Sequence, residues 1–199
     1  MSIGIVYYST YGTTYALAQE LAAGVEAQGS TVEYRRVEEL MPDEVMDENA
    51  RSFAESQRDV PLASVDELPE FDGLLIGSPT RFGNKTAQLS QFLDQTGPLW
   101  QQGALAGKPV GFFTGSASIH GGQETTLLTM STFAFHQGMV IVPMGYIHPT
   151  MQSTRTGGTP YGPSHFSPMD GSKDGLDDDE RQIARAYGEH FAGIVAKLA

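Results

Sequence analysis

Residues 3–28 read IGIVYYSTYGTTYALAQELAAGVEAQ, and this stretch decides the fold. Residues 3–8 are apolar or aromatic, which is typical of a buried strand. Residues 14–28 predict a helix that ends before Gly29, because apolar side chains recur every four residues at Leu17, Leu21 and Val25. A short polar loop separates the two elements. A strand, a loop and a helix in this order predict the first half of a β–α–β unit in a parallel sheet.

The same alternation continues to the end of the chain. The pattern predicts further strands at 31–37, 71–78, 109–114 and 138–144, and further helices at 86–94, 124–136 and 177–198. Because crossovers between parallel strands are right-handed, the simplest topology is a doubly wound, three-layer α/β sandwich. Five parallel strands favour the flavodoxin-like order 2-1-3-4-5, in which ligands bind beyond the carboxyl ends of the strands.

We expect residues 1–199 to form a single domain with two added segments, 41–70 and 146–176. The first contains Ser64-x-x-Glu67, a capping box that predicts a helix start. The second is rich in Gly, Pro, Ser and Thr, and a loop of this length is usually functional or disordered. Its aromatic residues favour a functional or interface-forming role over a flexible surface loop: Tyr146, Tyr161 and Phe166.

The composition excludes several classes of protein. Acidic residues outnumber basic ones by 24 to 12, and the net charge is −12. This charge argues against binding to nucleic acid or to an anionic membrane surface. Without cysteine there is no disulfide, Cys-ligated zinc, iron–sulfur cluster or thiol nucleophile. The five histidines lack close metal-ligand spacing, so we expect no metal site. No secretion signal or apolar run of about 20 residues is evident, so we expect a soluble cytoplasmic protein.

The first of three polar loops follows the strand at 3–8. Its hydroxyl groups can bind phosphate oxygens, Gly12 allows close approach of the backbone, and the free N–H groups of the next helix point to the same place. This pattern predicts a phosphate site built without Lys or Arg. The alternative is an ordinary polar turn that caps a helix. The loop consists of Ser9, Thr10, Tyr11, Gly12, Thr13 and Thr14.

Two further polar loops follow the strands at 71–78 and 109–114. In residues 78–84, Arg81 supplies hydrogen-bond donors and Phe82 a flat face. In residues 114–124, small residues would allow a flat ligand to lie against the main chain. Each loop by itself could be a simple turn, but all three follow carboxyl ends of strands, which favours one shared site. The chain has no G-x-G-x-x-G sequence, which argues against a Rossmann dinucleotide site.

Longer motifs resemble those of the WrbA family, flavodoxin-like NAD(P)H:quinone oxidoreductases also called tryptophan-repressor-binding proteins. The resemblance covers the chain almost end to end. The most specific motifs are PTRFGN at 79–84, FLDQTG-x-LW at 92–100, GGQE at 121–124, GMVIVP-x-GY at 138–146 and GGTPYG at 157–162.

This resemblance implies FMN as the cofactor, with its phosphate on the first loop and its isoalloxazine ring between the second and third loops. It also implies that Tyr11 lies near the NAD(P)H nucleotide and Trp100 near the quinone, in an aromatic box completed by a neighbouring subunit of a homotetramer, a dimer of dimers. The two added segments would then line the site and form assembly contacts. The implied cofactor contacts are Ser9, Thr10, Tyr11, Gly12, Thr13, Thr14, Pro79, Thr80, Arg81, Phe82, Gly83, Asn84, Gly115, Ser116, Ala117, Ser118, Gly121, Gly122 and His136.

The implied reaction is a two-electron reduction of quinones by NAD(P)H, with ping-pong kinetics because both substrates use one pocket. We expect Arg81 to stabilise the reduced ring, and either His136 or water to supply a proton. One alternative is a flavodoxin-type one-electron carrier, for which the acidic surface would suit a basic partner. Another is a non-enzymatic regulatory protein, as the older family name suggests.

Overall fold

A computed structural model describes residues 1–170, 172–173 and 175–199. Its parallel sheet has the strand order β2-β1-β3-β4-β5, which confirms the predicted order. β3 and β4 are buried along almost their whole length, as the apolar runs at 71–78 and 109–114 predict. The first four strands are β1 (Ser2–Tyr7), β2 (Thr31–Arg36), β3 (Gly73–Pro79) and β4 (Pro109–Ser116), of which β2 lies at the edge.

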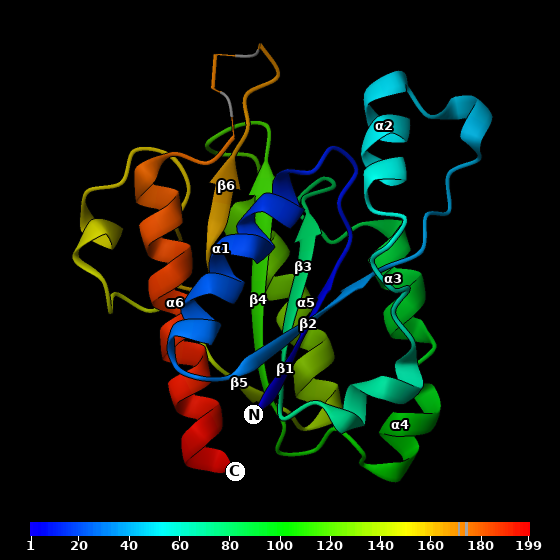
Figure 1. Cartoon of the computed structure of the whole chain (residues 1–199), viewed down its shortest axis with the longest axis vertical. Helices are drawn as coiled ribbons and strands as arrows, with labels where there is room; N and C mark the ends of the chain where they lie inside the picture. Colours follow the sequence, from blue (N-terminus) through cyan, green and yellow to red (C-terminus); the bar gives the residue numbers. More distant parts are fainter. Residues whose placement is uncertain (171, 174) are drawn as a thin grey trace.

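Helices cover both faces of the sheet and make three layers (Figure 1). Successive residues of β1 point to opposite faces, so Ile5 packs under α1 and α6, whereas Val6 packs on the side of α3 and α5. Each face therefore has its own apolar core. The helices that pack on these two faces include α1 (Thr13–Ala27), α3 (Ala87–Asp94), α5 (Gln123–Gln137) and α6 (Asp178–Leu198).

The edge strand next to β4 differs from the predicted single strand at 138–144. It is split into β5 (Val140–Ile141), which pairs with the start of β4, and β6 (Ser164–Phe166), which pairs with its end. The prediction of one long fifth strand was wrong. The last ladder bond runs from the N–H of Val142 to the carbonyl of Val110, at 2.9 Å. The carbonyl of Val142 instead accepts from the Tyr187 hydroxyl at 2.5 Å, and the chain leaves the sheet there and returns at β6.

The added segments contain short helices. Residues 41–70 hold α2 (Glu48–Ser56) between the 3₁₀ turns η1 (Asp43–Val45) and η2 (Val65–Glu70). η2 starts directly after Ser64, as predicted, but the capping hydrogen bonds are absent. Glu67 instead binds Arg35 at 2.6 Å. Residues 97–102, left without a predicted helix, form α4 (Gly97–Gln102).

Residues 146–176 are fastened to the start of α6 by one buried carboxylate. This segment contains η3 (Pro149–Gln152) and β6, and its residues 171 and 174 lie outside the described part. Glu180 accepts hydrogen bonds from the backbone N–H groups of Gly157 and Phe166 and contacts His165 Nδ1 at 2.8 Å. Burial raises the pKa of Glu180, but hydrogen bonds from His165 and Lys173 lower it overall, so the carboxylate stays charged.

The contact between α1 and α6 depends on two glycines. A Cβ on Gly24 would lie 2.0 Å from the carbonyl oxygen of Arg185, and one on Gly188 would lie 2.1 Å from that of Leu21. The backbones therefore approach closer than any side chain permits. Glu20 adds a clamp at the same contact, because its two carboxylate oxygens bind Arg181 at 2.6 Å and Arg185 at 2.5 Å.

Gly24→Ala should therefore destabilise the fold, by about 2 kcal/mol or more, because overpacking forces the two backbones apart. The matched control is Gly193→Ala on α6, where a Cβ meets nothing within 4 Å. There the better helix propensity of alanine should stabilise the protein by about 0.5–1 kcal/mol. Chemical denaturation of both variants measures this, and equal effects of the two substitutions would contradict the close contact.

Candidate functional site

The parallel register brings the three predicted loops to one edge of the sheet. Tyr7 of β1 lies opposite Gly77 of β3, and Pro79 of β3 lies opposite Gly115 of β4. The ladder extends into the loops, since the N–H of Thr80 donates to the carbonyl of Gly115 at 2.9 Å. All three loops thus leave neighbouring strands at their carboxyl ends, at the top of Figure 1.

The first loop presents a helix start that no side chain caps. α1 follows Gly12, which has a left-handed φ of 91°, and no side chain hydrogen-bonds to the N–H groups of its first turn. Thr14 is fully buried, and its hydroxyl finds no partner within the described part of the chain. Buried hydroxyls are normally hydrogen-bonded, so these groups indicate a ligand with oxygen acceptors.

The second loop carries a strained aromatic residue. Arg81 and Asn84 exchange two backbone hydrogen bonds, at 2.7 and 3.0 Å, and close a two-residue turn. Both turn residues have positive φ, 54° at Phe82 and 77° at Gly83, as in a type I′ turn. Phe82 is fully exposed, and within the described residues no other non-glycine residue has positive φ. Such strain is typical of ligand sites.

The third loop touches the second. α5 starts after Gly122, again with a left-handed φ of 92° and no side-chain cap, and a Cβ on Gly122 would lie 2.8 Å from Cα of Gly83. Across the same contact, the hydroxyls of Thr80 and Thr126 lie 2.8 Å apart. Gly83 and Gly122, both among the expected cofactor contacts, are therefore needed for the contact between the two loops.

A buried amide fixes the shape of the third loop. Gln123 donates to Ser116 Oγ at 2.9 Å and accepts from Ser164 Oγ at 2.5 Å. Ser116 in turn donates to the carbonyl of Ser118 at 2.7 Å. β6 therefore supports the loop through Gln123, which the sequence analysis did not include in the site. The sequence feature that could have indicated a role for Gln123 is its position in the GGQE motif at 121–124.

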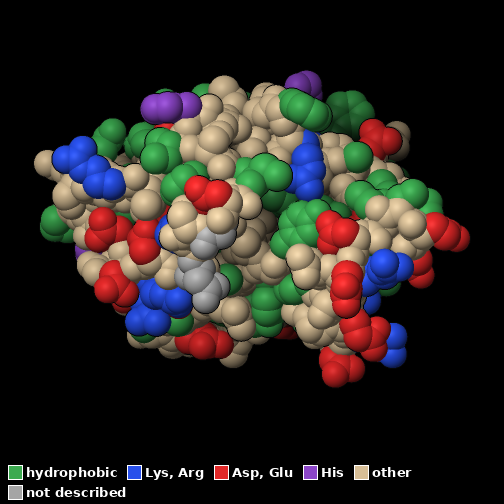
Figure 2. All heavy atoms as spheres, turned by 90° about the horizontal axis from the view of Figure 1, so that it is seen from above, with side chains coloured by type: hydrophobic (Ala, Val, Ile, Leu, Met, Phe, Trp, Pro, Cys, Tyr) green, Lys and Arg blue, Asp and Glu red, His purple; other side chains and the backbone are tan. Residues whose placement is uncertain are grey.

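α2 covers the outer side of the first loop. A Cβ on Gly12 would lie 3.1 Å from the Phe53 ring, and the half-exposed Tyr11 donates to Asp47 at 2.8 Å. Asp47 also caps α2 by accepting from the N–H of Ala50. Figure 2 looks onto this edge, and acidic side chains gather on the side where α2 lies. The 41–70 segment therefore contacts the first loop through Phe53 and Asp47.

The sequence of the first loop predicts a phosphate site without Lys or Arg, but the structure places a basic side chain beside it. Arg81 reaches across from the second loop, and its Nη2 donates to Thr10 Oγ1 at 3.0 Å. Nη1 donates to the carbonyl of Thr80, also at 3.0 Å. The guanidinium is therefore fixed between the two loops. This place favours a role for Arg81 at a bound anion, in addition to the ring contact that the sequence suggests.

Two predicted site residues lie apart from the loops within one chain. Trp100 is 59% exposed on α4, which leads into the start of β4 at the opposite end of the sheet (Figure 1). His136 is in the last turn of α5, about 20 Å along the helix from Gln123. It lines a groove of about 310 Å³ between α3 and α5, together with Lys85, Ser90, Leu93, Asp94, Thr132 and Phe133.

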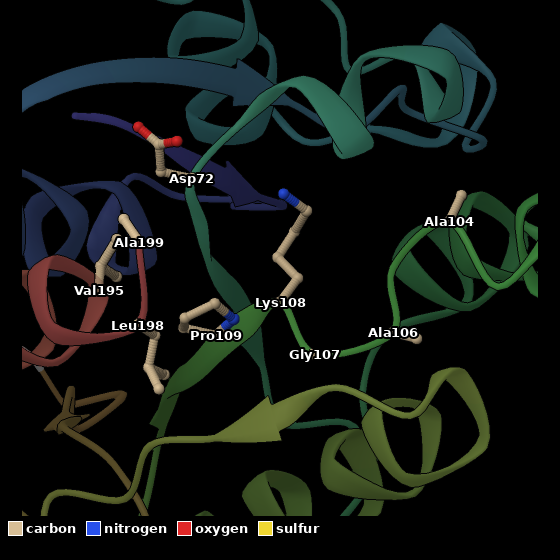
Figure 3. Close-up of a pocket in the computed structure, with 9 residues that line it drawn as sticks. All are labelled: Asp72, Ala104, Ala106, Gly107, Lys108, Pro109, Val195, Leu198 and Ala199. Carbon is tan, nitrogen blue, oxygen red and sulfur yellow. The ribbon is translucent and has the colours of Figure 1, made fainter.

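A second cavity, of about 240 Å³, lies at the amino ends of β3 and β4 (Figure 3). Its walls come from the loop that holds Asp72, the start of β4 and the end of α6. Lys108 donates to the carbonyl of Phe71, and burial lowers the pKa of its amine. The cavity lies at the sheet edge opposite the three loops and takes no part in the candidate site.

Comparison with known proteins identifies the family. The profile of the family described as "NADPH-dependent FMN reductase" matches residues 1–151. The chain belongs to this family. A protein of Geobacter sulfurreducens named "NAD(P)H dehydrogenase (quinone)" is 44% identical over 100% of this chain and 99% of its own length. One of the same name from Gluconacetobacter diazotrophicus is 42% identical over 98% and 97%. The resemblance drawn from the motifs is confirmed.

Solved structures of low identity show the same fold. A flavodoxin, WrbA-like protein of Agrobacterium tumefaciens has a TM-score of 0.67 at 22% identity and covers 100% of this chain and 99% of its own. Flavodoxin 2 of Bacillus cereus has a TM-score of 0.65 at 16% identity and covers 98% and 99%. These likenesses confirm the flavodoxin-like sandwich.

The residues of the loop edge fit FMN, the cofactor of this family. The uncapped start of α1, the unpartnered Thr14 hydroxyl and the Arg81 guanidinium suit a phosphate dianion. The glycine-lined contact between the second and third loops suits a flat ring. Within the described residues, no helix is long and apolar enough to span a membrane.

Thr14→Val should weaken FMN binding by about tenfold, because the phosphate loses a hydroxyl donor at equal side-chain volume. Flavin-free protein should be no less stable, since the substitution removes a buried hydroxyl without a partner. Flavin fluorescence titration and thermal melts measure both effects. Ser30→Ala is the control, because Ser30 is also buried with an unpartnered hydroxyl but follows the far end of α1. Unchanged FMN affinity in Thr14→Val would remove this hydroxyl from the site.

Proposed function

We propose that the protein is an FMN-dependent NAD(P)H:quinone oxidoreductase that converts quinones to hydroquinones by two-electron transfer in a ping-pong cycle. One structural observation carries this proposal: the uncapped start of α1 and the glycine contact between the second and third loops lie at one edge of the sheet. Two full-length relatives at 42–44% identity, named NAD(P)H dehydrogenase (quinone), support the substrate class.

The chain's own residues bind and orient the reactants. When bound, FMN would supply the redox chemistry, the transfer of a hydride's two electrons from NAD(P)H to a quinone that also takes up two protons. The first loop and α1 hold the phosphate, and the second and third loops enclose the ring. Phe82 and Tyr11 are exposed on the second and first loops, where aromatic faces can hold flat ligands by stacking.

The proposal includes a homotetramer in which each site is completed by a neighbouring copy. Trp100 is exposed but lies at the opposite end of the sheet, so it reaches a flavin only in another copy. α5 also presents Leu128 and Phe135, which are 47% and 71% exposed, to the outside. Such apolar side chains on one helix are suited to a subunit contact. His136 lies on the same helix and is brought to the site by the same assembly.

The proposed reaction can be tested with one anaerobic spectrum of the protein with added FMN. NADH or NADPH should bleach the flavin, and benzoquinone should restore its full absorbance. Initial rates should then give parallel double-reciprocal lines, because the two substrates share one pocket. Intersecting lines would contradict the ping-pong cycle. A bound flavin that neither nucleotide reduces would favour a one-electron carrier, and an absence of flavin binding would contradict the cofactor site.

The composite site can be tested by mixing two variants. Arg81→Ala damages the loops of its own chain, whereas Trp100→Ala should raise the KM for quinone at a neighbouring chain's flavin. After subunit exchange, some sites combine an intact Arg81 with an intact Trp100, so quinone reductase activity should exceed the mean of the two separate variants. Activity at that mean would show that each site is built within one chain. The same mixture before exchange is the control.

A further inference from the structure

A line of hydrogen bonds leads from the second loop through the first to the partly buried carboxylate of Glu39. Arg81 donates to Thr10 Oγ1 at 3.0 Å, Thr10 Oγ1 donates to the hydroxyl of Tyr8 at 3.4 Å, and Tyr8 donates to Glu39 Oε2 at 2.5 Å. Thr10 and Tyr8 are both buried. The line joins residues of three separate strand ends, β1, β2 and β3.

Glu39 stays charged although it is partly buried. Its carboxylate also accepts from Gln88 Nε2 at 2.6 Å and from the N–H groups of Leu40 and Met41, each at 2.9 Å. Burial raises the pKa of Glu39, but these hydrogen bonds and that from Tyr8 lower it overall. Burial and the hydrogen bond to Glu39 raise the pKa of Tyr8, so its hydroxyl keeps its proton.

The two ends of the line fix the direction of every proton in it. A guanidinium can only donate, and a carboxylate can only accept. Tyr8 must therefore give its proton to Glu39 and accept from Thr10, and Thr10 then offers only lone pairs to Arg81. Each donation strengthens the next. In this arrangement the Thr10 hydroxyl accepts from Arg81 and donates to Tyr8.

We propose that Tyr8 and Glu39 are positioning residues that hold the Arg81 guanidinium beside the first loop, where it binds the phosphate of FMN. This inference rests on the proposed flavin site and names the group that selects the phosphorylated flavin. Arg81 uses two of its N–H groups on Thr80 and Thr10, and its exposed guanidinium has others to offer an anion. Because Glu39 and Asp47 place negative charge near this loop, a fixed cation is needed to favour a dianion there.

The test compares FMN with riboflavin, which has the same ring and no phosphate. Both are titrated into the full-length protein, and the readout is the riboflavin Kd divided by the FMN Kd. In Tyr8→Phe the FMN Kd should rise about tenfold, while the riboflavin Kd should change less than about twofold. Glu39→Gln should act in the same direction, since an amide can also donate and no longer fixes the proton direction. Arg81→Gln should lower this ratio at least as much. Adding Tyr8→Phe to Arg81→Gln should change the ratio little further.

The control is Tyr187→Phe, which removes a hydroxyl of the same kind that donates to the carbonyl of Val142 at 2.5 Å within the α6 core. It should leave the ratio of Kd values unchanged. Equal weakening of both flavins by Tyr8→Phe, or no weakening of either, would overturn the positioning role while the flavin site stands. A wild-type protein that binds neither flavin would overturn the proposed function and this inference together.

Discussion

The register of β1, β3 and β4 is the constraint on which the rest of the molecule depends. The pairs Tyr7–Gly77 and Pro79–Gly115 place three loops side by side, and a slip of one residue would turn each strand's core side chains to the wrong face. Glycines inside the strands enforce this register. A Cβ on Gly77 would lie 2.2 Å from the Phe113 ring, so the two residues fit only as glycine beside a large aromatic. Glycine weakens an isolated strand, but here the buried aromatic side chain offsets that cost.

Charge and local stability are arranged around the loop edge rather than spread evenly. α3 and α6 start with side-chain caps at Thr86 and Asp177, whereas α1 and α5 start at left-handed glycines without one. A glycine N-cap is less favourable than a side-chain cap by only a few tenths of a kcal/mol, so α1 and α5 leave their first N–H groups free at little cost. A bound anion satisfies the same N–H groups. In a chain of net charge −12, the positive field for a phosphate thus comes from helix dipoles and Arg81 and not from clustered lysines.

Local patterns in the sequence predict the elements, and the rule for parallel sheets predicts where the loops meet. The apolar spacing of Leu17, Leu21 and Val25 is enough to place α1, because the residues that form one face of a helix all lie within the same short segment of the chain. β6 could not be predicted in this way, since three residues form a strand there only because the end of β4 offers them a partner. Arg81 and Thr10 are 71 residues apart, and only the finished sheet brings them together. The support of the third loop by Gln123 and Ser164 is hidden for the same reason.

Trp100 and His136 are a different case, because even the folded chain leaves them away from the loops. α4 precedes β4 and therefore lies at the amino end of the sheet, and no rotation of an exposed side chain spans the length of β4. A role for Trp100 at the flavin consequently requires a second copy whose amino end faces this carboxyl end. In the proposed closed assembly every copy gives and receives the same residue, so the exposed surface around Trp100 in one chain would complete the site of another. The separation of Trp100 from the loops within one chain is the geometry that this proposal requires.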